Sequence, residues 1–205
     1  AGLQSRDQGG VIDDLIVYEK SPDDIFIIPN AANCTDVVAV FEAAAPAGIT
    51  VTNLHMKFAV LALQGPLAGE VLKDLGLTID LEYMSFTQTT ISAHENLGNV
   101  IICRTGYSGE FGFELLPSWE SAESLWKLLV ALVEKRDGRV CGLGARDTLR
   151  TEMGYPLHGH ELSLEITPVQ ADANWAVGWK KESFRGSQAL RAEKENGPVR
   201  ILKGL

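Results

Sequence analysis

Two adjacent aspartates lie in the middle of an apolar segment, where carboxylates are seldom found. The segment GGVIDDLIVYEK, residues 9–20, has the branched and aromatic composition of a β-strand buried on both faces. Because strand side chains alternate between faces, Asp13 interrupts one apolar row and Asp14 interrupts the other. A carboxylate in such a row needs a partner, and desolvation raises its pKa toward the working range of a general base.

A third carboxylate, Glu114, lies in a similar setting between Phe113 and Leu115. It ends the stretch RTGYSGEFGFE, residues 104–114, whose glycines are typical of either a phosphate cradle or a strand, turn and strand. The stretch is not a GxGxxG sequence and no helix pattern follows it directly, so a dinucleotide site lacks its structural context. A strand and turn explains the glycines but not Glu114, which could grip a guanidine-like edge of a ligand through two parallel hydrogen bonds.

Two arginines follow in GLGARDTLR, residues 142–150. Arg146 and Arg150 are four residues apart and therefore share one face of a helix. Arg146 could meet a carboxylate from elsewhere in the chain, as part of a site or as a structural ion pair.

The segment HGHE, residues 158–161, raises the question of a metal. Two histidines and one glutamate are a thin ligand set, and no third histidine or cysteine lies nearby, so we predict no metal. A nucleophilic serine or cysteine site is also not indicated, since no GxSxG sequence occurs and no cysteine has an obvious base.

The elements that must position these residues predict an α+β protein. Residues 57–136 read as β-α-β-β-β-α, close to a split β-α-β unit of the ferredoxin-like kind. After Gly138 the chain becomes turn-rich and irregular. We therefore expect residues 51–138 to form a ferredoxin-like α+β unit, inserted into a second α+β unit made of residues 1–50 and 139–205.

The composition excludes several classes of protein. The net charge of −9 argues against a nucleic-acid surface, and no apolar stretch approaches the length of a membrane span. The three cysteines form no CxxC pair, which indicates a reduced compartment rather than a disulfide framework. The first residues resemble neither a signal peptide nor a transit peptide and include no initiator methionine. We expect the chain to be an internal fragment of a longer protein.

Several segments, in this order and spacing, resemble the aminomethyltransferase (T-protein) family of the glycine cleavage system. They are GGVIDDLIVY, LALQGP, TGYSGEFGFE, LGARDTLR and PLHGHELSLEITP, and FRGSQAL matches the segment that follows in the family. The resemblance departs from the family in one segment, TPVQADANW, where Gln170 stands in place of a common glutamate. It also lacks the family's upstream region and final β-domain, so we expect turnover to need more than this chain.

The resemblance implies a T-protein-like folate-binding domain, in which residues 1–50 and 139–205 form the first, truncated folate-binding unit. It implies transfer of the lipoyl-bound aminomethyl carbon to tetrahydrofolate, with release of ammonia and formation of 5,10-methylenetetrahydrofolate. Tetrahydrofolate would be the co-substrate and the lipoylated H-protein the partner, with no metal, nucleic acid or membrane. The compartment would be a bacterial-type cytoplasm or the mitochondrial matrix.

The resemblance also implies the residues of the site. Asp14, the second aspartate of the pair, would be catalytic and would polarise or deprotonate the folate amine. The folate-binding residues would be Ile16 (through its backbone), Asn30, Tyr107, Glu114 and Arg146.

Among these residues, Glu114 would pair with the amino-pyrimidine edge of the pterin, and Tyr107 would pack beside the ring. Arg146 would either orient Glu114 or hold the folate itself. Asp13, on the other face of the strand, is expected to be hydrogen-bonded to backbone or solvated at the edge of the strand.

Two alternatives stay open. A non-enzymatic folate-binding relative linked to iron–sulfur assembly carries a Lys-Gly-Cys-Tyr-x-Gly-Gln-Glu segment, whereas residues 181–190 read KESFRGSQAL and contain no cysteine. A folate-dependent demethylase or dimethylglycine-type enzyme domain shares the same fold, and fold alone does not decide between them. PLHGHEL and GGVIDDLIVY favour the glycine cleavage enzyme.

Overall fold

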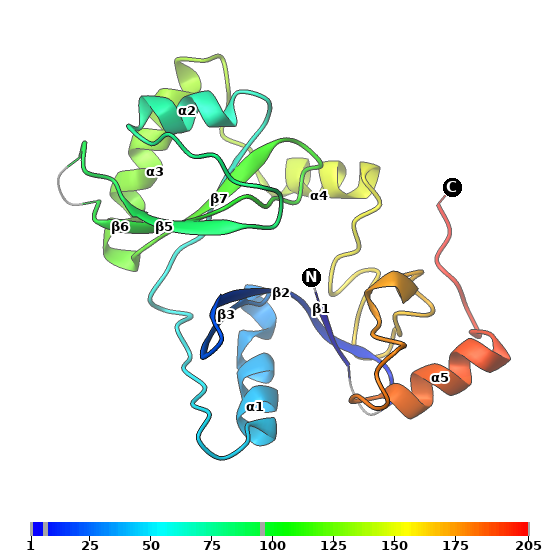
Figure 1. Ribbon diagram of the computed structural model, residues 1–205. Coiled ribbons are helices and arrows are strands. Elements are labelled where there is room, and N and C mark those ends of the chain that lie inside the picture. The colour runs from blue at the N-terminus through cyan, green and yellow to red at the C-terminus, as the bar shows by residue number, and fades with distance from the viewer. Residues whose placement is uncertain (1, 6–7, 95–96, 205) are drawn as a thin grey trace. The chain divides into compact units, whose positions relative to one another are not determined.

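The computed structural model describes residues 2–5, 8–94 and 97–204. The chain divides into a first unit, residues 1–53 and 156–205, and a second unit, residues 54–155 (Figure 1). Each unit combines helices with an antiparallel sheet. The predicted α+β class is therefore confirmed.

The first unit contains a three-stranded antiparallel sheet with the long strand β2 at its centre. Its strands, in the spatial order β1-β2-β3, are β1 (Gly2–Ser5), β2 (Val11–Ser21) and β3 (Asp24–Ile28). β2 carries both aspartates, and the register pairs Asp13 with Gln4 and Asp14 with Leu3 of β1. The aspartates thus pair with β1, whereas β3 pairs with the second half of β2, from Ile16 to Ser21.

The first unit also contains helices. They are the 3-10 helix η1 (Ala31–Asn33), α1 (Cys34–Ala44), the 3-10 helix η2 (Asn174–Ala176) and α5 (Ser187–Asn196). Ile12 and Leu15 of β2 pack against Val37 of α1, and Val11 packs against Leu162. Val11, Ile12 and Asp13 are all buried, so the first half of β2 is covered on both faces, as its composition predicted. In the second half the prediction is wrong for Val17, which is 50% exposed.

The second unit contains a four-stranded antiparallel sheet. Its elements are β4 (Leu61–Gln64), α2 (Ala68–Asp74), β5 (Phe86–Thr90), β6 (Asn99–Cys103), β7 (Gly112–Pro117), α3 (Trp119–Glu134) and α4 (Leu143–Glu152). The strand order is β4-β7-β6-β5. The strands joined by α2 therefore lie at opposite edges and run antiparallel, whereas a split β-α-β unit joins two parallel strands. The predicted order of elements holds, but the ferredoxin-like pairing is wrong.

Helices α2 and α3 cover one face of this sheet (Figure 1). Phe113 and Leu115 of β7 face this helical layer and pack in one core with Leu125 and Leu129 of α3. Because side chains alternate along β7, Glu114 projects from the opposite face. The sheet thus separates the hydrophobic core of the second unit from its candidate ligand-binding carboxylate.

The boundary between the units differs from the predicted one. Residues 139–155, which were expected to belong with residues 1–50, are part of the second unit. The change of texture after Gly138 marks the end of α3 rather than a change of unit. Long-range contacts assign α4, since Met153 at its end lies against Gly109 of the loop before β7.

The helices of the structure are short. The longest of those described, α3, has 16 residues, fewer than the roughly 20 that a membrane-spanning helix needs. Within the described ranges, no helix combines the length and the apolar character that crossing a bilayer requires.

Candidate functional site

Both aspartates of β2 contact one side-chain amide, that of Asn30, which follows β3. Asn30 Nδ2 donates to Asp13 Oδ1 at 2.8 Å, to Asp14 Oδ1 at 3.0 Å and to the Asp14 carbonyl oxygen at 3.1 Å. Because ionised carboxylates only accept hydrogen bonds, the amide must turn its nitrogen toward them. Asn30 Oδ1 accepts no hydrogen bond from the described part of the chain, so this acceptor is available to a ligand.

Asp13 is completely buried, with 0% of its surface exposed. Besides the Asn30 amide, it accepts hydrogen bonds from the backbone N–H of Asn30 at 2.9 Å and from Asn33 Nδ2 at 2.6 Å. The expected backbone hydrogen bond is present, and the alternative of a solvated Asp13 is wrong. Three donors offset the cost of burying this carboxylate, so Asp13 acts as an internal acceptor that fixes Asn30 and Asn33.

Asp14 is partly buried and has an altered pKa. Its pKa is raised from 3.8 to about 6, mainly by burial and further by the neighbouring charge of Asp13. Hydrogen bonding from Asn30 and the charge of His158 counteract part of this shift. A carboxyl group with a pKa near 6 can take up and return a proton close to neutral pH.

Ile16 lies two residues beyond Asp14 on the same face of β2, and the register pairs it with Ile28 of β3. The strand partner of Ile16 is therefore two residues before Asn30 in the chain. The folate-facing role of its backbone stays a prediction.

Of the two histidines of HGHE, His158 has a structural contact. His158 Nε2 lies 3.1 Å from the Val11 carbonyl oxygen, which joins the 156–166 segment to the start of β2. Within the described ranges, no group of three or more histidine, cysteine, aspartate or glutamate side chains has an arrangement that could hold a metal ion.

In the second unit, Glu114 has one strong intramolecular partner. Thr105 Oγ1 donates to Glu114 Oε2 at 2.5 Å, and Thr105 is itself buried. The other carboxylate oxygen, Oε1, accepts no hydrogen bond from the residues that the structure describes. Glu114 is thus oriented through one oxygen and keeps the other for a ligand donor.

Tyr107 lies between two side chains of the 143–155 region. The Arg146 guanidinium carbon is 4.5 Å from the centroid of the Tyr107 ring, and the ring of Tyr155 is 5.6 Å away at an angle of 36°. Arg146 is exposed and, within the described residues, forms no ion pair, with Glu114 or any other carboxylate. Its contact is a cation–π interaction, which leaves its N–H groups available for an anion.

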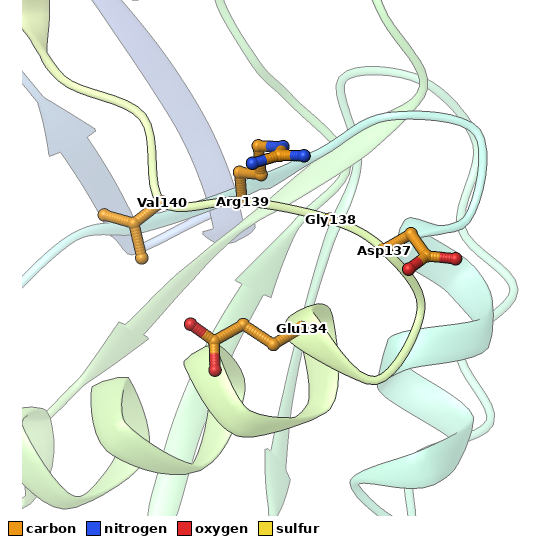
Figure 2. A pocket seen from close by; sticks show the side chains of 5 residues that line it. All are labelled: Glu134, Asp137, Gly138, Arg139 and Val140. Carbon is orange, nitrogen blue, oxygen red and sulfur yellow. The ribbon is translucent and has the colours of Figure 1, made fainter.

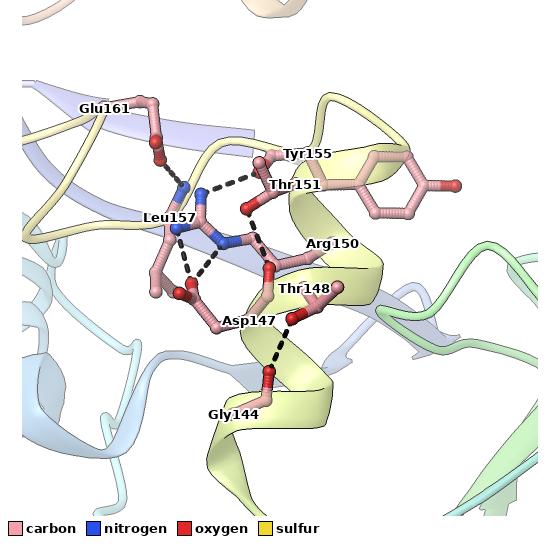
Figure 3. Close-up of polar contacts among 8 residues, drawn as sticks. All are labelled: Gly144, Asp147, Thr148, Arg150, Thr151, Tyr155, Leu157 and Glu161. Carbon is pink, nitrogen blue, oxygen red and sulfur yellow. Dashed lines mark hydrogen bonds and ion pairs between the residues drawn. The ribbon is translucent and has the colours of Figure 1, made fainter.

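The structural ion pair of α4 falls on the other arginine. Arg150 is buried and donates to Asp147 Oδ1 through Nε at 2.8 Å and Nη2 at 2.6 Å (Figure 3). It also donates to the Tyr155 carbonyl oxygen at 3.4 Å. Although Arg146 and Arg150 were expected on one helical face, one is exposed on an aromatic ring and the other is internal.

Comparison with known proteins identifies the family. The family model described as the GCVT N-terminal domain matches residues 2–181. This chain belongs to the GCVT N-terminal domain family. The resemblance to the glycine cleavage T-protein is therefore confirmed.

Similar proteins carry one name. The chain is 57% identical to the "Aminomethyltransferase" of Mycobacterium avium (strain 104) over 203 residues, which is 99% of this chain and 54% of that protein. It is 57% identical to the "Aminomethyltransferase" of Parafrankia sp. over 197 residues, 96% of this chain and 53% of that protein. The chain therefore spans about half the length of the curated relatives it matches.

A solved structure agrees with the computed fold. The crystal structure of glycine cleavage system aminomethyltransferase T from Bartonella henselae matches with a TM-score of 0.83 and 32% sequence identity. The match covers 97% of this chain and 53% of that one. Both units of this GCVT-family chain thus fall within the matched fold.

The predicted site residues separate by unit. Asp14, Ile16 and Asn30 belong to the first unit, where the structure brings Asp14 and Asn30 into contact. In the second unit it brings together Tyr107 and Arg146.

Sequence reasoning missed three supporting neighbours of this set, namely Asn33, Thr105 and Tyr155. Asn33 stands at the N-cap position of α1, yet its amide bonds Asp13 instead of the helix. A signal existed for Thr105, which lies in the same TGY motif as the predicted Tyr107.

Gln170, where the family commonly has glutamate, is buried in a polar network of the first unit. Its Nε2 donates to Glu193 Oε1 at 2.7 Å, and its Oε1 accepts from Arg200 Nε at 2.9 Å. An amide fits here because it can donate to one charged partner and accept from the other. Gln170 therefore forms hydrogen bonds with both of its charged neighbours. It has no direct contact with Asp14.

A surface depression after α3 carries none of the predicted site residues. It is lined by Glu134, Asp137, Gly138, Arg139 and Val140. Figure 2 shows the two carboxylates and the arginine pointing in different directions, so they do not converge on a common ligand position. The candidate site of this chain lies with the residues described above.

Proposed function

We propose that the protein carrying this chain is a tetrahydrofolate-dependent aminomethyltransferase of the glycine cleavage system. It takes the aminomethyl group from the lipoyl arm of the H-protein and transfers the carbon to tetrahydrofolate, with release of ammonia. The carbon loses its bonds to sulfur and to the ammonia nitrogen and gains bonds to two folate nitrogens. The two protons of those folate nitrogens balance the released thiol and ammonia. Relatives named Aminomethyltransferase at 57% identity support this proposal.

One observation carries the proposal: Asp14 is a partly buried carboxyl group with a pKa of about 6, held by an asparagine. In its ionised form Asp14 accepts a proton from the folate amine as that amine bonds to the incoming carbon. General-base assistance of this kind is typically worth about 10²–10⁴ in rate. The hydrogen bond from Asn30 keeps the carboxylate in a single orientation.

The remaining predicted residues suit a pterin and its charged tail. The free oxygen of Glu114 is an acceptor, which matches the N–H groups of an amino-pyrimidine edge. Asn30 Oδ1 is an acceptor for a donor group of the folate. Ile16 would add backbone groups on the same strand as Asp14. Tyr107 supplies an aromatic face next to the ring.

Arg146 contacts Tyr107 and not Glu114, which favours a role in holding the folate over a role in orienting Glu114. Its exposed guanidinium offers several donors in a planar fork, an arrangement suited to a carboxylate. We therefore propose that Arg146 binds an acidic group of the folate.

We further propose that the partner is the lipoylated H-protein and that the reaction runs in a bacterial-type cytoplasm. The similar proteins from Mycobacterium and Parafrankia support the bacterial setting. No metal, nucleic acid or membrane takes part in this scheme.

The test is calorimetric titration with 5-formyltetrahydrofolate, a stable reduced folate, on this chain and on the full-length polypeptide that carries it. We expect binding that Glu114→Ala weakens by about tenfold or more, because a ligand donor loses a charged acceptor. Glu110→Ala is the matched control, since Glu110 is exposed in the same loop. Absence of binding by both parent proteins would contradict the proposal.

Turnover separates the enzymatic proposal from a folate-binding role without chemistry. Aminomethyl-loaded H-protein and tetrahydrofolate are supplied to the full-length polypeptide, and ammonia is measured. Release of ammonia that depends on both substrates is expected. Tight folate binding without ammonia release would instead favour the non-enzymatic alternative.

A further inference from the structure

We propose that Gln64 is a positioning residue for folate binding, which holds the loop that presents Tyr107 and leads into Glu114. This loop, residues 104–111, connects β6 to β7 and is called the 104–111 loop below. The inference rests on the proposed function. Gln64 ends β4 in the LALQGP segment, to which the proposed chemistry assigns no role.

The amide of Gln64 contacts both ends and the middle of the loop region. Its Nε2 donates to the carbonyl oxygens of Thr105 at 3.2 Å and Phe113 at 3.1 Å. Its Oε1 accepts from Ser108 Oγ at 2.8 Å. Both ends of the amide are therefore used, and a single side chain ties the start of the loop to the start of β7.

The loop fits closely around this amide. A Cβ added to Gly106 would lie 1.9 Å from Gln64 Oε1, and one added to Gly112 would lie 2.6 Å from Gln64 Cδ. Neither glycine has a left-handed φ, so the backbone conformation does not require glycine at these positions. At Gly106 the close approach of the Gln64 side chain requires glycine, and at Gly112 the Leu63 carbonyl oxygen, also 2.6 Å from the added Cβ, contributes equally.

Other contacts hold different parts of the loop. The Arg104 guanidinium carbon lies 4.0 Å from the ring centroid of Phe111, and the N–H of Gly65 donates to the Phe111 carbonyl oxygen at 2.7 Å. Arg104 Nη1 also donates to the Gly112 carbonyl oxygen at 3.1 Å, so these contacts hold the two ends of the loop. Thr105 and Ser108, the two positions that Gln64 holds, instead flank Tyr107.

The consequence for ligand binding follows from the hydrogen bonds of Thr105. Its carbonyl oxygen accepts from Gln64, and its hydroxyl donates to Glu114. Loss of the Gln64 amide therefore releases the segment that orients Glu114 and, at the same time, the backbone on both sides of Tyr107. Both residues contact the folate in the proposed function, so a looser loop should weaken binding without changing the proton transfer at Asp14.

The experiment uses the full-length polypeptide with Gln64→Leu, which keeps the approximate volume and removes all three hydrogen bonds. We expect the Kd for 5-formyltetrahydrofolate and the KM for tetrahydrofolate to rise about tenfold or more, with kcat unchanged within about twofold. Gln88→Leu is the matched control, because Gln88 is exposed on β5 of the same sheet. Ser108→Ala removes one of the three hydrogen bonds and should cause a smaller rise in the same direction.

A second measurement uses the fit between Gln64 and Gly106. Gly106→Ala should raise the Kd in the parent, because the new Cβ displaces the Gln64 amide. In a Gln64→Ala background the same change should raise it little further, since the obstructing side chain is gone. This non-additivity is the signature of two residues that act through one contact.

Four results would overturn the inference. Gln64→Leu with parental Kd and KM, or additive effects of the two substitutions, removes the positioning role while the parent still binds folate. A lower melting temperature and a lower kcat with unchanged KM assign Gln64 to stability alone. A parent that binds no folate overturns the proposed function, and this inference falls with it.

Discussion

A side-chain amide organises the candidate residues of each unit, but the two amides have different kinds of partner. Asn30 in the first unit donates to the carboxylates of Asp13 and Asp14. Gln64 in the second unit donates to the carbonyl oxygens of Thr105 and Phe113. The first amide contacts a group whose pKa is raised to about 6, whereas the second contacts neutral backbone.

The difference separates two tasks in the proposed function: proton transfer by the first unit and ligand binding by the second. Burial beside a second carboxylate raises the pKa of Asp14, which affects the chemical step. Close packing of glycines against Gln64 holds the shape of the 104–111 loop, which affects the affinity for the ligand. Substitutions in the first cluster should therefore act on rate and pH dependence, and substitutions in the second should act on affinity.

Asp14→Asn gives the largest expected effect. The amide keeps the shape of the carboxylate but cannot accept a proton, so kcat should fall by about 10²–10⁴ while the Kd for 5-formyltetrahydrofolate changes by only a few fold. Ammonia release by the full-length polypeptide measures the rate, and calorimetry measures the Kd. Asp23→Asn, on an exposed turn, is the control. A Kd that rises as steeply as kcat falls would contradict the separation of tasks.

The same substitution should stabilise the folded protein at neutral pH. Asp14 has a folded-state pKa of about 6 against 3.8 ordinarily, so its contribution to stability is complete below pH 3.8 and is lost as the pH rises through 6. At about 1.4 kcal/mol per pKa unit, the parent should lose roughly 2–3 kcal/mol that Asp14→Asn keeps. Denaturant unfolding at pH 4 and pH 7 measures this, with Asp23→Asn as control. An equal difference between variant and parent at both pH values would refute the assignment.

Local pattern predicted much of the fold. β2 was predicted because its apolar residues are consecutive, and the order β-α-β-β-β-α predicted for residues 57–136 is found in β4, α2, β5, β6, β7 and α3. The boundary at 139 and the ferredoxin-like pairing were wrong because both depend on long-range contacts. The pairing of β4 with β7 and the contact of Met153 with Gly109 join residues more than forty positions apart.

The candidate site divides in the same way. Asp14 and Glu114 could be found from sequence because a charge in an apolar strand is conspicuous. Asn33 and Gln64 could not, since polar residues at a helix start or a strand end are common and reveal their partners only in three dimensions. The three glycines of the RTGYSGEFGFE stretch were attributed to a strand, turn and strand, which the structure confirms, but only Gly109 has a left-handed φ.

Gly109→Ala tests a second point of contact in the 104–111 loop. Gly109 has a φ of +77°, and an added Cβ would lie 2.4 Å from Met153 Cγ. We expect a destabilisation of about 1–2 kcal/mol from the backbone conformation, with a further loss from displacing Met153. Thermal unfolding of both variants compares it with Gly98→Ala, which has a φ of +61° in the same unit and no neighbour within 4 Å of the new Cβ. Equal losses would show that the loop does not depend on contact with α4.

Gln170→Glu should cause the smallest change in stability. It tests whether charged contacts also stabilise the first unit away from Asp14. The new carboxylate would face Glu193, so we expect a loss of about 1 kcal/mol at pH 7 that shrinks at pH 4. Arg200 keeps an acceptor and limits the loss. Gln188→Glu adds the same charge on the exposed side of α5 and should change stability little.

Pairing this change with Glu193→Gln completes the test. The double variant restores one donor and one acceptor between positions 170 and 193, so its loss should be smaller than the sum of the two single losses. Additive losses in urea unfolding would mean that the hydrogen bond between Gln170 and Glu193 does not contribute to stability. Folate affinity should stay at the parental value in all three variants, because Gln170 has no direct contact with the aspartates or Asn30. A change in affinity would show that the charges around Gln170 also influence folate binding.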